Sequence, residues 1–190
     1  MIVGVLLAAG GARRFKSQKL IARYRGVTLV EHAAMRLRAA TDAVVAVVGH
    51  DADAVRDALA GWDIRIVENR EWQSGLASSL RRGVEAIPGD AEAIVVAVGD
   101  QPGLDSAVTH AVIARWRETG QSIVSATYRG VRGHPVLFAR SIFPELLELQ
   151  GDAGARLLIE RSAERVEYVD IDAEMPPDVD TVEQLSALDE

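Results

Sequence analysis

The stretch IVGVLLAAGGARRFKSQKL, residues 2–20, decides the fold because an apolar run ends abruptly in a glycine pair. Residues 2–8 are apolar or glycine, which is typical of a strand buried on both faces of a sheet. The glycine pair then permits a sharp turn that exposes backbone N–H groups. Both lysines of the chain, Lys16 and Lys19, follow the turn, and no acidic residue occurs before Glu31. This pattern predicts a strand, a turn and a cationic loop that favours a phosphate group.

The overall composition limits the kinds of partner that this loop can serve. The chain has 190 residues with 48% hydrophobic content, which suits one domain spanning residues 1–190. Its net charge of −7 disfavours a nucleic-acid partner, so the basic loop is expected to hold a small anion locally. No apolar run is long enough for a membrane span and no basic region precedes the apolar amino terminus, so we expect a cytoplasmic protein without a membrane partner. The chain has no cysteine, which excludes disulfides and thiolate chemistry.

Short apolar runs alternate with segments of helical period, which indicates an α/β fold with a three-layer, doubly wound, mostly parallel sheet. Helices are expected from a capping box at Thr28 and Glu31, over residues 78–86, and from Asp105 or Ser106 to about residue 118. A last short helix should follow Pro177, opened by Asp180 or Thr181, so that the carboxyl terminus folds back. The predicted strands are residues 2–8, 43–48, 64–67, 93–98 and 123–128, with residues 136–138 and 166–169 as later additions.

Three loops follow predicted strands and should meet at the carboxyl edge of the sheet, where ligands bind in such folds. They are residues 10–14, 69–75 and 99–102. Asp100, directly after a buried valine run, is placed to hold a hard divalent cation such as Mg²⁺ against a phosphate. The alternative interpretation is a turn aspartate that bonds its own backbone.

Two familiar phosphate-binding loops are excluded by spacing. The glycine pair does not provide the G-x-G-x-x-G fingerprint of a dinucleotide site, and residues 10–16 do not match G-x-x-x-x-G-K-[ST]. What remains is a glycine turn with Arg14 and Lys19 as reaching cations. Such a turn suits a triphosphate whose charge increases on the leaving group during transfer.

The residues also resemble a known family, the MobA-like nucleotidyltransferases that build dinucleotide forms of the molybdenum cofactor. LAAGGARRFKSQKL is similar to the family signature A-A-G-x-S-x-R-M-G-x-x-K, with Ala12 in place of serine and Lys16 in place of glycine. Five further segments resemble the cytidylyltransferase branch in the same order. They are NREWQSGLASSLRRG (69–83), GDQP (99–102), RGHPVLF (132–138), GDAGARLLI (151–159) and DVDTVEQL (178–185).

The resemblance implies a Rossmann-like nucleotidyltransferase that transfers CMP from CTP to the terminal phosphate of molybdopterin, requires Mg²⁺ and releases pyrophosphate. The Ala8-Ala9-Gly10 turn resembles the members that use cytidine. Arg14, Lys19 and Asp100 match the family's catalytic residues, and Asp100 with Asp180 matches its metal ligands. The two departures leave the details of nucleotide binding open, since Ala12 lacks a hydroxyl and Lys16 adds a cation.

The expected site is built from two groups of residues. The nucleotide would contact Leu7, Ala8, Ala9, Gly10, Gly11, Ala12, Arg14, Lys19, Gly75, Ser78, Ser79 and Asp100. The acceptor would contact His134, Gly151, Asp152 and Arg156. Ordinary helix capping by the serines and a structural hydrogen bond by His134 are the alternatives. The three tryptophans, at positions 62, 72 and 116, are interpreted as core or interface residues rather than ligand platforms.

Other functions remain open from the sequence alone. Guanylyl or other nucleotidyl transfer is the nearest alternative, and an oxidoreductase using a nicotinamide nucleotide on the same fold is a second. A carrier that delivers the cofactor to a molybdoenzyme client is a third. The retained Lys19, Asp100 and Asp180 favour metal-dependent transfer, because hydride transfer has no use for a pair of metal-binding carboxylates.

Overall fold

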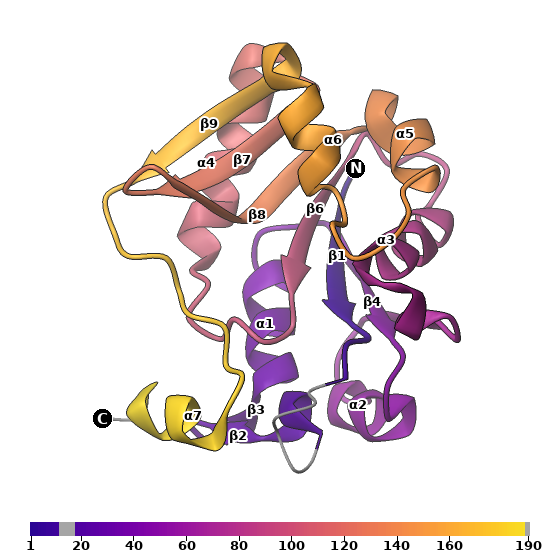
Figure 1. The fold of residues 1–190 in the computed structure, drawn as a ribbon, viewed down its shortest axis with the longest axis vertical. Helices are drawn as coiled ribbons and strands as arrows, with labels where there is room; N and C mark the ends of the chain where they lie inside the picture. The colour runs from indigo at the N-terminus through magenta and orange to yellow at the C-terminus, as the bar shows by residue number, and fades with distance from the viewer. Residues whose placement is uncertain (12–17, 189–190) are drawn as a thin grey trace.

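The computed structural model describes residues 1–11 and 18–188. Within these residues seven strands form one sheet in the order β5-β4-β1-β6-β8-β7-β9 (Figure 1). Strands β5, β4, β1 and β6 are parallel to one another, β8 runs antiparallel between β6 and β7, and β7 pairs in parallel with β9. The strands are β1 Ile2–Ala8, β4 Ala43–Val48, β5 Arg65–Glu68, β6 Ala93–Val98, β7 Ile123–Tyr128, β8 Val131–Ala139 and β9 Val166–Ile171. The predicted α/β class with a mostly parallel sheet is confirmed.

Helices cover both faces of the sheet and make the predicted three layers (Figure 1). One face packs against α1 (Leu29–Arg38), α2 (Ala52–Leu59) and α4 (Ser106–Thr119). The other face packs against α3 (Leu76–Glu85), α5 (Phe143–Leu147) and α6 (Arg156–Arg161). Short 3-10 turns are η1 Lys19–Ile21, η2 Trp72–Ser74, η3 Arg140–Ile142 and η4 Ala163–Arg165. None of the helices in the described part of the chain has the length and apolar character that crossing a membrane requires.

Strand β1 lies at the centre of the packing because every one of its residues is buried. Alternate side chains serve opposite layers: Leu6 belongs to the core under α1, whereas Val5 belongs to the core under α3. Two glycines allow the helices to approach closely. A Cβ atom at Gly4 would lie 2.5 Å from Leu37 Cγ on α1, and one at Gly83 on α3 would lie 2.6 Å from Val5 Cγ1. The carboxyl end of β1 is therefore held in place from both faces.

The carboxyl-terminal segment folds back to the end of the molecule where β1 and β6 terminate, at the bottom of Figure 1. Helix α7 (Val182–Leu188) packs its Leu185 against Tyr24 of the small hairpin formed by β2 (Arg23–Tyr24) and β3 (Val27–Thr28). Thr181 accepts a hydrogen bond from the Gln184 backbone N–H at 3.2 Å, so Thr181 caps this helix as expected. The fold-back of the terminus is confirmed.

The predicted boundaries hold best where burial is complete. The strands at residues 2–8, 43–48, 93–98 and 123–128 match the structure, as does the capping box of Thr28 and Glu31. Strand β8 begins at Val131, five residues before the predicted start, because its first residues are exposed or half-buried and carry no apolar run. Helices α2, α5 and α6 have no individually predicted counterpart, since each is short and begins without a side-chain cap hydrogen bond.

We expect Gly4→Ala to lower the free energy of unfolding by about 1–3 kcal/mol, because the added methyl group overlaps the buried Leu37 side chain. Gly61→Ala is the matched control, since no atom lies within 4 Å of its new methyl group. Urea unfolding followed by circular dichroism measures both. Equal stability of the two variants would contradict the close packing of β1 on α1.

Candidate active site

Three loops meet at the carboxyl edge of the parallel strands and enclose a cavity of about 530 Å³. The loops follow β1, β5 and β6, and His50, which follows β4, also borders the cavity. We call this space the first cavity. It is lined by Leu7, Ala9, Gly10, Gly11, Lys19, Leu20, His50, Trp72, Gln73, Gly75, Leu76, Ser79, Val98, Asp100 and Asp152. The meeting of the glycine turn, the Trp72 loop and Asp100 is the arrangement that the sequence predicts.

A buried lysine joins three distant parts of the chain at this cavity. The Lys19 ammonium donates hydrogen bonds to Asp100 Oδ2 at 2.7 Å and to Asp180 Oδ1 at 2.9 Å. We call these three residues the Lys19 cluster. The Lys19 side chain is only 10% exposed, whereas Asp100 is 24% and Asp180 49% exposed. A further hydrogen bond of 3.0 Å, from Val179 N to the Asp100 carbonyl oxygen, fastens the carboxyl-terminal segment at the same place.

The electrostatics of the Lys19 cluster favour cations. Burial opposes the charged ammonium of Lys19, but the Asp100 carboxylate and then Asp180 outweigh it, so the pKa of Lys19 is raised. Desolvation, followed by the neighbouring Asp100 carboxylate, raises the pKa of Asp178. Two carboxylates thus contact one ammonium, so the Lys19 cluster has excess negative charge, and Asp178 is a further acidic group that senses it.

Asp100 and Asp180 are the residues of this site that could hold a hard divalent cation. Both present oxygen atoms to one point, which the Lys19 ammonium reaches. Among residues 1–11 and 18–188 no three acidic, histidine or cysteine side chains form a complete ligand set. Mg²⁺ characteristically takes one or two carboxylates and completes its shell with water and substrate phosphates. A pair of carboxylates beside an open cavity is therefore sufficient for such an ion.

A network around Asn69 shapes the loop between β5 and α3. The buried Asn69 side chain donates to Ser78 Oγ at 2.8 Å and Ser79 Oγ at 3.0 Å, and its Oδ1 accepts from Glu71 N at 2.9 Å. At Gly75, φ is +109°, and an added Cβ would lie 2.5 Å from the Gly151 carbonyl carbon. The loop is thus determined by a satisfied amide and by a position that admits only glycine.

A second cavity of about 830 Å³ adjoins the first and shares Leu7, Leu76 and Asp152 with it. We call this space the second cavity. Its walls are mostly apolar, with basic side chains at a few places. It is lined by Leu7, Leu76, Leu80, Val96, Ser125, Gly130, Val131, Arg132, Gly133, His134, Val136, Phe138, Asp152, Ala153, Ala155, Arg156 and Ile159.

His134 lies in the second cavity with a fixed backbone. Burial lowers the pKa of His134 against a smaller opposing effect of the Asp100 carboxylate, so the imidazole is neutral at pH 7. The Tyr128 hydroxyl donates to the His134 carbonyl oxygen at 2.7 Å. Burial, with the Asp105 carboxylate, raises the pKa of Tyr128 to about 12, which keeps this donor protonated.

The residues predicted for the site divide by location. Those lining the first cavity are Leu7, Ala9, Gly10, Gly11, Lys19, Gly75, Ser79, Asp100 and Asp152, and those lining the second are His134, Asp152 and Arg156. Ala8 and Ser78 line neither, because Ala8 points into the core under α1 and Ser78 bonds Asn69 and two backbone carbonyls. Gly151 supports the loop through its carbonyl oxygen, which accepts from Ala77 N at 3.1 Å. Ala12 and Arg14, with Lys16, lie outside the described residues.

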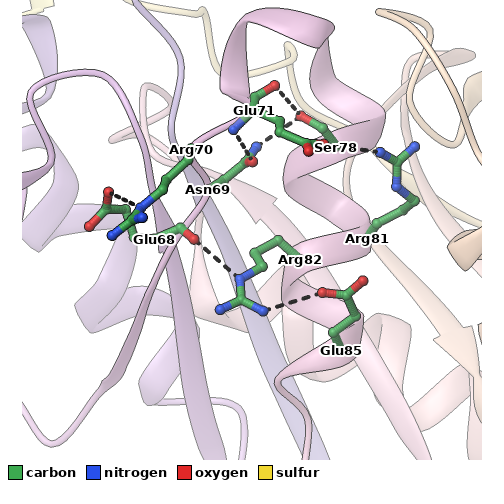
Figure 2. A pocket seen from close by; sticks show the side chains of 8 residues that line it. All are labelled: Glu68, Asn69, Arg70, Glu71, Ser78, Arg81, Arg82 and Glu85. Atoms are coloured by element: carbon green, nitrogen blue, oxygen red, sulfur yellow. Dashed lines mark hydrogen bonds and ion pairs between the residues drawn. The ribbon is translucent and has the colours of Figure 1, made fainter.

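A separate charged cleft of about 510 Å³ lies along α3 and the end of β5. Figure 2 shows its eight lining residues, Glu68, Asn69, Arg70, Glu71, Ser78, Arg81, Arg82 and Glu85. Its three arginines are balanced by three glutamates, and ion pairs join Arg70 to Glu68, Arg81 to Glu71 and Arg82 to Glu85. The charges cancel within the cleft, so it offers no excess cation to a phosphate.

Three residues that shape or line the first cavity were not predicted from the sequence. Asn69 directly follows β5, and that position was the available signal. His50 and Trp72 stack on each other at the rim of the first cavity, with ring centroids 5.1 Å apart. No spacing rule predicts this pair, because the two residues come from loops after different strands.

The model of the MobA-like NTP transferase domain matches residues 4–166, which include most of β1, the Trp72 loop and Asp100. The chain belongs to the MobA-like NTP transferase family. Nicotine blue oxidoreductase of Paenarthrobacter nicotinovorans is similar to it, with 36% identity covering 98% of this chain and 96% of that protein. By family and fold the chain is a nucleotidyltransferase.

Solved structures of MobA-like relatives agree with this fold. Rv0371c from Mycobacterium tuberculosis H37Rv has a TM-score of 0.87 and 32% identity, covering 99% of this chain and 97% of that one. The same mycobacterial protein in complex with manganese has a TM-score of 0.81, with coverage of 98% and 97%. A nucleotidyl transferase from Methanothermobacter thermautotroptrophicus has a TM-score of 0.83 at 25% identity, covering 99% and 95%. A divalent metal thus accompanies one protein of this fold at 32% identity.

We expect Mn²⁺ to stabilise Lys19→Met more than it stabilises the wild-type protein. Without the ammonium, Asp100 and Asp180 lose a positive charge that both contact, which should cost about 1–3 kcal/mol for partly exposed groups. Mn²⁺ replaces the missing positive charge between them. Urea unfolding with and without Mn²⁺ measures the difference.

The double variant Lys19→Met/Asp100→Asn is the control, because it also lacks the Lys19 ammonium and in addition lacks one of the two carboxylates. It should respond weakly to Mn²⁺. If Mn²⁺ stabilises the wild type, the single variant and the double variant equally, the two aspartates do not form the cation site.

Proposed function

We propose that the protein transfers CMP from CTP to molybdopterin, with Mg²⁺ required and pyrophosphate released. The observation that carries this proposal is the junction of two unlike cavities at Leu7, Leu76 and Asp152. The first cavity has mixed polar and apolar walls that include Lys19 and Asp100, whereas the second is mostly apolar with arginines at its rim. A nucleotide and a flat heterocyclic acceptor can thus occupy adjoining spaces with their phosphates near each other.

The triphosphate would lie at the glycine turn, where Gly10 and Gly11 border the cavity beside the Lys19 ammonium. Lys19 would exchange its aspartate contacts in part for phosphate oxygens, and Arg14 is proposed as the second cation. Asp100 and Asp180 would hold Mg²⁺, which neutralises phosphate charge when bound. The lysine then stabilises the charge that increases on pyrophosphate during transfer.

No nucleophile and general base are needed for this reaction. The attacking group is a phosphate oxygen that is already an anion, so the protein contributes by placing the two substrates and neutralising their charge. The Lys19 cluster supplies charge, and the Asn69 network keeps the Gly75 loop, with Ser79, in a single shape.

The second cavity suits a pterin with a terminal phosphate. Apolar side chains such as Leu80, Val96 and Phe138 would pack on the ring faces. Arg132 and Arg156 approach the same Glu160 carboxylate, at 3.0 and 3.8 Å, so the rim has more basic than acidic charge at this place. Asp152 borders both cavities and would contact either substrate. A molybdoenzyme would be the recipient of the product.

An oxidoreductase acting with a nicotinamide nucleotide is the second candidate. The relative named nicotine blue oxidoreductase favours it, since it covers 98% of this chain at 36% identity. The Lys19 cluster favours nucleotidyl transfer, because paired carboxylates at a phosphate site have no role in hydride transfer. Guanylyl transfer differs from the first candidate only in the base.

We expect CTP with Mg²⁺ to raise the melting temperature by about 5–11 °C at a hundredfold excess over Kd, and to exceed GTP and NADH. With molybdopterin, CTP should release pyrophosphate. Lys19→Ala should lower kcat/KM for CTP by about 100- to 1,000-fold, because it removes a donor directed at the developing charge. A thermal-shift panel of the four nucleoside triphosphates and NADH, followed by a pyrophosphate-release assay, measures these effects.

Arg70→Ala is the matched control. Arg70 is a cation of the charged cleft, its side chain is 88% exposed, and it does not line the first cavity. It should keep the wild-type rate. An equal rise in melting temperature with GTP and with CTP would refute the cytidine assignment. A rise with NADH alone would favour the oxidoreductase.

A further inference from the structure

The rim of the first cavity contains a pair of stacked aromatic rings from two loops. The His50 and Trp72 rings have centroids 5.1 Å apart and planes inclined by only 8°. This is an offset-stacked arrangement, one of the two that aromatic pairs prefer. Both residues border the cavity with Gly10 and Gly11. The pair thus presents aromatic surface beside the phosphate-binding turn.

Neighbouring glycines make room for this pair. A Cβ at Gly11 would lie 2.6 Å from His50 Cδ2 and 3.1 Å from Trp72 Cζ3. A Cβ at Gly49 would lie 2.8 Å from the Trp72 Cβ. Larger residues at either position would displace a ring, so the two glycines allow the rings to lie directly against the turn.

The backbone on each side of the pair is also held firmly. His50 N donates to the Ala9 carbonyl oxygen at 3.0 Å, and the His50 carbonyl oxygen accepts from Gln18 Nε2 at 2.6 Å. Trp72 lies in η2, inside the loop that Asn69 shapes. The rings are therefore preorganised before any ligand binds, which reduces the entropic cost of stacking a third ring.

Exposure separates the two rings. His50 is exposed, whereas Trp72 is half-buried and also packs against the core under α3. Both rings still border the first cavity. The Lys19 ammonium borders the same cavity and provides a place for phosphates. A ligand with a planar ring and a phosphate chain satisfies both features at once.

We propose that the His50–Trp72 pair is the platform on which the nucleobase of the triphosphate substrate stacks. This inference rests on the proposed function, because it assumes that a nucleoside triphosphate is the ligand of the first cavity. Every base has a π face, so stacking adds affinity without selecting a base. Selection is then left to hydrogen-bonding groups of the same cavity, such as Gln73 and Ser79.

The test compares Kd values for two probes, CTP and inorganic tripolyphosphate, each with Mg²⁺, by isothermal titration calorimetry. His50→Ala and Trp72→Leu should each raise the Kd for CTP by about 5- to 150-fold and change the Kd for tripolyphosphate by less than twofold. The Kd for GTP should rise by a similar factor, so that the ratio of CTP affinity to GTP affinity stays the same. Trp62→Phe is the control, since Trp62 packs against the core under α1 and borders neither cavity.

The outcomes separate this inference from the proposed function. Wild-type CTP affinity in both variants would refute the platform and leave nucleotide binding intact. Equal weakening of CTP and tripolyphosphate would also refute it, since the rings would then act on the phosphate loop. A wild-type protein that binds no nucleoside triphosphate would refute the proposed function, and the platform with it. His50→Ala keeps the test valid if Trp72→Leu does not fold, because His50 is exposed.

Discussion

The parallel pairing of β1 with β4 on one side and β6 on the other is the constraint on which the rest of the structure depends. Buried on both faces, β1 can take part in this sheet only as an inner strand, and its neighbours then end at the same edge. The glycine turn after β1 and Asp100 after β6 are brought together for that reason. The order of the strands is enough to place these loops together, without specific contacts between the loops.

The Lys19 cluster adds a second constraint at this edge. One ammonium holds residues that lie 81 and 161 positions away in the chain, and it thereby brings the carboxyl-terminal segment to the cavity. Buried ion pairs contribute little net stability when desolvation is included, so the arrangement is better explained by function than by folding. An ammonium between two carboxylates offsets part of their negative charge, and it borders the cavity in which phosphates would lie.

The sequence was sufficient for the features that depend on local pattern and strand order. Buried strands such as 93–98, the capping box at Thr28 and the meeting of the loops after β1 and β6 all follow from apolar runs, cap residues and the rule for strand ends. Residues whose position depends on packing between loops were not predictable. Ser78 shows this, because its hydroxyl turns to Asn69 and away from the first cavity. Trp72 shows it as well, since it packs against the core under α3, as the sequence suggested, but also stacks on His50 at a cavity rim, which the sequence did not indicate.

The central claim is that one site, formed by two adjoining cavities, binds a metal–nucleotide at the Lys19 cluster. A crystal structure with a non-hydrolysable CTP analogue and Mn²⁺, using the anomalous signal of the metal, tests it most directly. We predict a Mn²⁺ peak within bonding distance of the Asp100 and Asp180 carboxylates, phosphates on Lys19 and the base in the first cavity. A nucleotide in the charged cleft along α3, or a metal peak away from both aspartates, would contradict the account.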